Sequence, residues 1–152
     1  MKKIAVLLVG FVLAMGLLHT ALAAEKGTKA EAVALVKKAV AFYKANGRDK
    51  ALAEFNKPKG QFVDRDLYVF VGDMQGKCLA HCIMPAMAGK DMMEVQDPEG
   101  RFITKERLQM LQKNNTAWQT YKYLNPTTKK VETKSTYMER VGDIYIGVGV
   151  YQ

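Results

Sequence analysis

The chain has 152 residues, a length that suits one domain, and its 23 basic and 15 acidic residues give a net charge of +8. The basic residues are scattered and form no nucleic-acid-binding motif, so we expect no nucleic-acid partner, while small anionic ligands suit the charge. Gly-x-Ser-x-Gly, P-loop and HExxH motifs are lacking. We therefore predict no catalytic residues, no cofactor and no enzymatic activity.

The first 23 residues are predicted to be a signal peptide. Lys2 and Lys3 precede an apolar run from Ile4 to Leu18, and Ala21-Leu22-Ala23 supplies a small-residue cleavage site. Cleavage would make 24–152 the mature domain and place it in the periplasm. An uncleaved signal anchor is the alternative.

Two helices are predicted to open the mature chain. Thr28 and Glu31 have the spacing of a capping box, and apolar residues follow at helical intervals until Asn46-Gly47 ends the run. A shorter helix is expected from about Asp49 to Phe55. The broad apolar face of the first helix needs a partner surface.

The rest of the chain predicts an antiparallel sheet with an inserted segment. Leu67 to Val71 is rich in branched and aromatic residues, and residues 77–82 return as its hairpin partner. A loop then leads to a helix at 104–113, and strands follow at about 117–124, 131–141 and 144–151. This order of elements indicates an α+β domain.

The last three strands separate into two faces if Leu124 opposes Val131 and Val141 opposes Ile144, because directly opposed residues share a face. The predicted core face carries Trp118, Leu124, Val131, Tyr137, Val141, Ile144, Ile146, Val148 and Val150. The other face carries Tyr121, Tyr123, Glu132, Lys134, Thr136, Met138, Arg140, Tyr145, Gly147, Gly149 and Tyr151.

The second face suggests a binding pocket. Its alternate glycines leave room for something to approach the sheet. If residues 84–113 cover this face, they roof a pocket in which a lysine and tyrosine hydroxyls could hold a small carboxylate. A solvated face is the alternative.

Three stretches of the chain resemble the single-Cache sensor domains (type 2) of bacterial chemoreceptors and sensor kinases. They are DLYVFVGDMQGKCLAH, GKDMMEVQDPEGRFI and YKYLNPTTKKVETKSTYMERVGDIYIGVGVY. The resemblance runs from about residue 30 to the C-terminus. It implies a PAS-like fold, with a long N-terminal helix on a five-stranded antiparallel sheet and a loop-helix insertion over a pocket.

The resemblance also implies a ligand site without catalysis. Carried over by position, the ligand-binding residues are His81, Trp118, Tyr121, Tyr123, Lys134 and Tyr137. Trp118 and Tyr137 fall on the core face of the register above, which conflicts with a pocket role. The chain departs from the family pattern at residues 82–85 and at Val148.

These observations predict an exported sensor of a short organic acid or similar small solute, acting in signal transduction such as chemotaxis. With no output module in the sequence, it would act through a separate membrane receptor or kinase. A homodimer through the N-terminal helix is a further expectation. A structural accessory subunit with an empty pocket is an alternative.

The segment CLAHCIMPAMAGKDMM raises a second alternative, a periplasmic copper protein. Its candidate ligands are Cys78, His81, Cys82, Met84 and Met87, because thiolate, thioether and imidazole together suit Cu(I). Methionine is also a flexible filler of cavities, which favours packing over a metal site. Within one strand the two cysteines lie too far apart for a disulfide, so a bridge requires the strand to end near Ala80. In such a strand, His81 points away from both thiols.

Overall fold

A computed structural model describes residues 26–152 of the chain. The predicted signal peptide lies outside the described residues. The elements are α1 (Lys29–Asn46), α2 (Arg48–Glu54), β1 (Val63–Asp64), β2 (Leu67–Asp73), β3 (Cys78–His81), η1 (Pro85–Met87), α3 (Ile103–Lys113), β4 (Thr116–Leu124), β5 (Val131–Val141) and β6 (Ile144–Tyr151).

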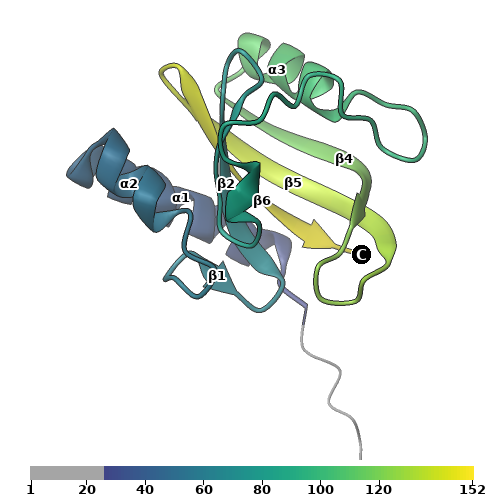
Figure 1. The fold of residues 1–152 in the computed structure, drawn as a ribbon, viewed down its shortest axis with the longest axis horizontal. Helices are drawn as coiled ribbons and strands as arrows, with labels where there is room; N and C mark the ends of the chain where they lie inside the picture. The colour runs from purple at the N-terminus through teal and green to yellow at the C-terminus, as the bar shows by residue number, and fades with distance from the viewer. Residues whose placement is uncertain (1–25) are drawn as a thin grey trace, which may run out of the picture.

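The strands form one antiparallel sheet in the order β1-β2-β6-β5-β4, and β3 also pairs with β2. Helices α1 and α2 lie on one side of this sheet, while α3 and the segment before it lie on the other (Figure 1). The predicted α+β, PAS-like architecture is confirmed. The predicted count of five strands is one short, because the two-residue strand β1 is too brief to leave a periodic pattern.

The start of α1 has the predicted capping box. The Thr28 hydroxyl accepts a hydrogen bond from the Glu31 amide at 3.2 Å, and the Glu31 carboxylate accepts one from the Thr28 amide at 2.7 Å. At the other end, the Gly47 amide donates to the Tyr43 carbonyl. The buried side of α1 packs against β5 and β6, which gives the first helix its expected partner surface.

The predicted strand register is confirmed. Leu124 opposes Val131, and Tyr121 opposes Lys134, in the β4–β5 pair. Val141 opposes Ile144 across a two-residue turn in the β5–β6 pair. The last three strands therefore sort their side chains onto the two faces that the sequence predicts.

The predicted core face is only partly a core. Residues of β6, from Ile144 to Val150, are buried, but Trp118 is 39% exposed, and Leu124 and Val131 are each 54% exposed. The difference arises because β4 is the edge strand, and α1 packs mainly against β5 and β6, while its first residue, Lys29, places an amino group over the Trp118 ring. The alternation of side chains along a strand thus predicts which face of the sheet a residue lies on, but it does not predict how far the covering helix extends.

Replacing Trp118 with alanine tests this correction. Because the side chain is partly solvated, we expect the free energy of unfolding to fall by less than about 1 kcal/mol. Phe55→Ala in the fully buried core is the comparison, with an expected loss of about 3–5 kcal/mol. Urea denaturation measures both. Equal losses for the two variants would show that Trp118 is a core residue after all.

Candidate functional site

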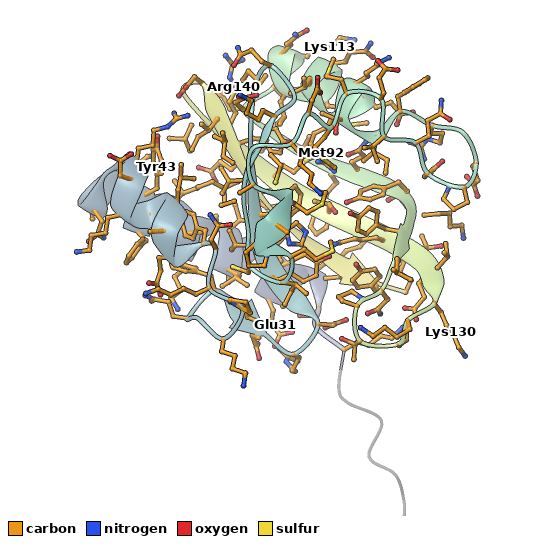
Figure 2. All side chains as sticks on the ribbon, in the orientation of Figure 1. Glu31, Tyr43, Met92, Lys113, Lys130 and Arg140 are labelled. Carbon is orange, nitrogen blue, oxygen red and sulfur yellow. The ribbon has the colours of Figure 1, made fainter. Side chains whose placement is uncertain are left out.

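A cavity of about 50 Å³ lies between the sheet and the inserted segment. Because one water molecule needs about 10–15 Å³ on this measure, the cavity has room for about four water-sized groups. Figure 2 shows the inserted segment around Met92, one of the lining residues, between the sheet and α3. The lining residues are Phe70, Val71, Cys78, His81, Met87, Met92, Val95, Ile103, Thr104, Arg107, Tyr121, Tyr123, Lys134 and Tyr145.

The structure brings four of the six predicted ligand-binding residues together. They line the cavity from three strands, and they are His81, Tyr121, Tyr123 and Lys134. The other two do not line it. Trp118 and Tyr137 lie opposite each other on the α1 side of the sheet, with ring centroids 5.4 Å apart, as the register indicates.

The two alternate glycines of β6 make room for side chains of the cavity wall. A Cβ atom at Gly147 would lie 2.6 Å from the Phe70 ring, and one at Gly149 would lie 2.1 Å from Cε of Lys134. The expected space above the sheet therefore exists, but Phe70 and the lysine stem occupy it. Both side chains can lie against the sheet only because these positions lack a side chain.

Arg107 of α3 is a functional candidate that the sequence interpretation missed. It lines the cavity and is only 6% exposed. Its Nε donates to Oε1 of Gln119 at 3.2 Å, and Gln119 in turn donates to the Ile103 carbonyl at 2.8 Å. Gln119 thus links the guanidinium to β4 through Nε and leaves the two Nη groups to contact other side chains.

Those remaining neighbours are weak partners for a charged group. Nη2 of Arg107 donates to the Tyr121 hydroxyl at 3.3 Å and Nη1 to the Tyr145 hydroxyl at 3.4 Å. Both acceptors are neutral, and both distances exceed the usual range for charge-assisted hydrogen bonds. The guanidinium therefore keeps a donor pair without an anionic partner among residues 26–152.

The sequence did contain a signal for Arg107. It stands four residues after Ile103 and four before Leu111, so it falls on the apolar stripe of α3. Arginine is rarely buried in proteins unless it is paired. A cation on the buried stripe of an amphipathic helix is therefore a reason to expect a site beneath it.

Lys134 of β5 is the second basic residue on the cavity and is 1% exposed. Its amino group donates to the Tyr68 hydroxyl, which lies 3.0 Å from the Tyr151 hydroxyl. Tyr151 donates to the Leu124 carbonyl at 3.2 Å. A carbonyl can only accept, so the Tyr151 hydroxyl uses its proton on Leu124 and accepts from the Tyr68 hydroxyl. Each hydrogen bond in this series is therefore donated in the direction from Lys134 to Leu124.

Aromatic rings enclose the lysine amino group. Nζ lies 4.1 Å from the ring centroid of Tyr68, 4.7 Å from that of Tyr151 and 5.3 Å from that of Tyr123. Burial, and then the charge of Arg107, lower the pKa of Lys134 well below its usual range, while the charge of Asp66 acts in the opposite direction. Within residues 26–152 no carboxylate forms a salt bridge with Lys134.

His81 of β3 supplies a neutral donor to the same site. The Met84 amide donates to its Nδ1 at 3.1 Å, so Nδ1 is the unprotonated nitrogen and Nε2 carries the proton. Burial, and then the nearby Lys134, lower the pKa of His81 to about 4. The ring lies over those of Tyr68 and Phe70, with centroids 5.0 and 6.2 Å away.

Comparison with known proteins agrees with this geometry. The family model described as single Cache domain 2 matches residues 3–152. The chain belongs to the single Cache domain 2 family. No curated protein matches it in sequence.

Solved structures show the same Cache fold. A methyl-accepting chemotaxis protein from Vibrio parahaemolyticus RIMD 2210633 is 26% identical, with a TM-score of 0.68, and the match covers 81% of this chain and 87% of that one. A Cache chemosensory domain described for carboxylic acid recognition and a periplasmic sensor domain of a chemotaxis protein are each 18% identical. Both have a TM-score of 0.62 and match 80% of this chain, covering 86% and 88% of their own, respectively.

In this Cache domain the two cysteines lie on opposite sides of the sheet. A bulge in the β2–β3 pair places Gly72 opposite Cys78 and Val71 opposite Ala80, which shifts the alternation by one residue. Cys78 therefore shares the cavity with His81, contrary to the prediction that they face apart. Cys82 instead belongs to the core beneath α1 and α2.

Both thiols are free, buried and protonated at neutral pH. Burial raises the pKa of Cys78 to about 11 and that of Cys82 to about 12. The described residues contain no group of three or more His, Cys, Asp and Glu side chains that could hold a metal ion. Of the candidate copper ligands, Cys78, His81 and Met87 line the cavity, whereas Cys82 and Met84 do not, so the structure gives the copper alternative no support.

No helix within residues 26–152 is long and apolar enough to cross a membrane.

The lowered pKa of His81 predicts a pH-dependent stability. Between pH 6.5 and about 4 the unfolded chain binds a proton at this histidine, while the folded domain does not. The free energy of unfolding should therefore fall by up to about 3 kcal/mol as the pH drops through this window. Urea denaturation of the wild type and of His81→Gln measures the effect. The free energy of unfolding of the variant should lack this part of the pH dependence. The same pH dependence in both proteins would contradict the lowered pKa of His81.

The close approach of Lys134 to Gly149 can be tested by a double-mutant cycle. Gly149→Ala should lower the free energy of unfolding by about 1–3 kcal/mol, because the new Cβ overlaps the lysine stem. In a Lys134→Ala background the same substitution should cost less, since the stem is gone. Equal costs in both backgrounds would show that the lysine does not explain the glycine.

Proposed function

We propose that this Cache domain binds a short carboxylate in the cavity and that ligand binding is its signal. The observation that carries the proposal is the pairing of two buried basic side chains, Arg107 and Lys134, on a small cavity. Among the described residues that line this cavity, none is an aspartate or glutamate. The site therefore offers positive charge and hydrogen-bond donors without an anion of its own.

Electrostatics favours an anion in such a place. Removing a charged group from water is costly unless an opposite charge and hydrogen bonds compensate for it. A carboxylate beside Arg107 would supply both, because its two oxygens match the paired Nη donors of a guanidinium. The low polarity of the surrounding rings would strengthen that attraction.

The remaining walls limit what accompanies the carboxylate. Met87, Met92 and Val95 of the inserted segment, together with Ile103 and Phe70, present apolar surface to the cavity. With room for about four water-sized groups, the cavity suits an acid of two or three carbons. The structural neighbour described for carboxylic acid recognition supports this ligand class.

We also infer the wider setting of the domain. The inserted segment contributes residues to the cavity roof, so a ligand that closes this segment over itself would change the outer surface. A membrane receptor or kinase would bind the changed surface. Two copies of the domain would form a homodimer through the N-terminal helix. The predicted signal peptide and the periplasmic sensor domain among the neighbours support a periplasmic location.

Isothermal titration calorimetry with acetate, propionate, pyruvate and lactate tests the proposal. At least one of these acids should bind the wild type. Arg107→Met should weaken that binding by about 30-fold or more, since the carboxylate loses a buried charged partner. Arg140→Met is the matched control, because Arg140 donates to the carbonyls of Gly142 and Leu111 and does not line the cavity.

Far-ultraviolet circular dichroism would establish that both variants fold. Binding that survives in folded Arg107→Met unchanged would contradict the assigned role of Arg107. Failure of all four acids to bind the wild type would overturn the proposed ligand class.

A further inference from the structure

The large hydrophobic side chains that are exposed among residues 26–152 all lie on one face of the β4–β5 pair. Trp118 is 39% exposed, and Leu124 and Val131 are each 54% exposed. Leu124 and Val131 oppose each other beside the turn, and Trp118 lies six residues before Leu124, so alternation places it on the same face. We call these three residues the hairpin patch. Exposed apolar residues that gather on one face indicate an interaction surface.

Lysines surround the hairpin patch. Lys122 lies on the same face of β4 between Trp118 and Leu124, and the amino group of Lys29 lies 5.4 Å from the Trp118 ring centroid. Two more lysines are exposed in the turn that joins Leu124 to Val131, and Lys26 begins the described chain beside β5. The lysines of this rim are Lys26, Lys29, Lys122, Lys129 and Lys130.

The charge of the rim is largely uncompensated. Within residues 26–152, Lys26 forms a salt bridge with Glu132 at 3.3 Å, and the other four lysines of the rim form none. Glu132 also accepts hydrogen bonds from Asn125 and Thr128, so its charge is shared among several donors. The hairpin patch therefore lies within a positively charged surface that suits an anionic partner.

The described chain begins at the same end of the domain. The salt bridge of Lys26 with Glu132 places this residue next to Val131, and Figure 1 shows the start of α1 and the turn between β4 and β5 on the same side of the domain. In the sequence, Lys26 follows Leu18, the last residue of the predicted apolar run, by eight residues. Eight residues span at most about 28 Å. While that run is held in a membrane, during export or as an anchor, the hairpin patch therefore lies close to the bilayer.

A bilayer with anionic lipids suits this surface better than a second copy of the domain. Two copies that met through the hairpin patch would bring two sets of lysines together, and like charges repel across an interface. The apolar surface of three partly exposed side chains is also a small part of the about 800 Å² per partner that a stable interface buries. A bilayer offers anionic headgroups to lysines, and tryptophan favours the boundary between headgroups and acyl chains.

We propose that the hairpin patch docks this domain on the surface of a bilayer that contains anionic lipids. Trp118, Leu124 and Val131 enter the boundary of the acyl chains, and the lysines of the rim contact the headgroups. The inference does not depend on the proposed function, because none of these residues lines the cavity. The inserted segment lies on the other side of the sheet, so docking leaves it uncovered (Figure 1).

Trp118 is the single tryptophan of the chain, so its fluorescence reports on the hairpin patch alone. The full chain is added to vesicles of phosphatidylcholine with brominated acyl chains, in which an increasing fraction of the lipid is brominated phosphatidylglycerol. Bromine quenches tryptophan that contacts the acyl chains, whether or not the signal peptide is attached. Quenching should be small in phosphatidylcholine alone and rise with the phosphatidylglycerol fraction. About 0.5 M NaCl should reverse it, because salt screens the lysines.

Two double variants test the two parts of the surface. Leu124→Gln with Val131→Thr removes apolar side chains and keeps Trp118 as the reporter. Lys129→Gln with Lys130→Gln removes two charges of the rim. At equal phosphatidylglycerol content, each pair should reduce the quenching to about half or less of the wild-type value. All four side chains are exposed, so both variants should fold, which circular dichroism checks.

Lys44→Gln with Lys50→Gln is the matched control. Both lysines are exposed, and they lie at the end of α1 and in α2. Figure 2 shows Tyr43, the neighbour of Lys44, on the opposite side of the domain from Lys130. This pair removes the same charge as the rim variant and should leave the quenching unchanged. An equal loss in the control would mean that net charge alone attracts the protein to the vesicles, which rejects the hairpin patch.

The wild type decides the remaining alternatives. Absence of quenching at every phosphatidylglycerol fraction would overturn the inference, and so would equal quenching in phosphatidylcholine alone. Analytical ultracentrifugation without vesicles tests for a second copy on the same surface. A dimer that Leu124→Gln with Val131→Thr dissociates would assign the hairpin patch to contact between copies instead of a bilayer.

Discussion

The burial of Arg107 and Lys134 in one aromatic cavity is the constraint on which the rest of the site depends. Each side chain is almost fully enclosed, and the hydrogen-bond acceptors around each of them are neutral. A domain could be stabilised more simply by apolar side chains at both positions. Keeping two basic side chains there is explained if an anion enters the cavity, and the small volume of the cavity limits that anion to a short acid.

The sheet holds these basic side chains in place through features some distance apart in the chain. The β4–β5 register sets Tyr121 beside Lys134, and Gly149 lets the lysine stem lie flat against β6. Gln119 fixes the guanidinium of Arg107 from the neighbouring strand. The roof comes from α3 and from the residues before it, which have little regular structure, so the sheet forms the floor and the inserted residues form the roof. A ligand that binds between floor and roof can therefore shift the roof and change the outer surface of the domain.

Much of this arrangement could be predicted from the sequence because it depends on local patterns. The capping box of α1, the register of the last three strands and the placement of His81, Tyr121, Tyr123 and Lys134 on one face follow from spacing, alternation or family resemblance. The exposure of Trp118 could not be predicted, because it depends on how far α1 extends over the sheet. The sharing of one face by Cys78 and His81 depends on a bulge, which the alternation does not reveal. The leucines of α3 predict the helix but do not single out Arg107, which lies between Ile103 and Leu111 on its buried stripe.

The most direct measurement of the central claim is a crystal structure of the domain grown with whichever of acetate, propionate, pyruvate and lactate binds it most tightly. The account predicts density for the acid in the cavity, with its carboxylate within hydrogen-bond distance of both Nη groups of Arg107. A cavity that contains only water at a saturating concentration of that acid, or an acid bound with its carboxylate away from Arg107, would contradict the account.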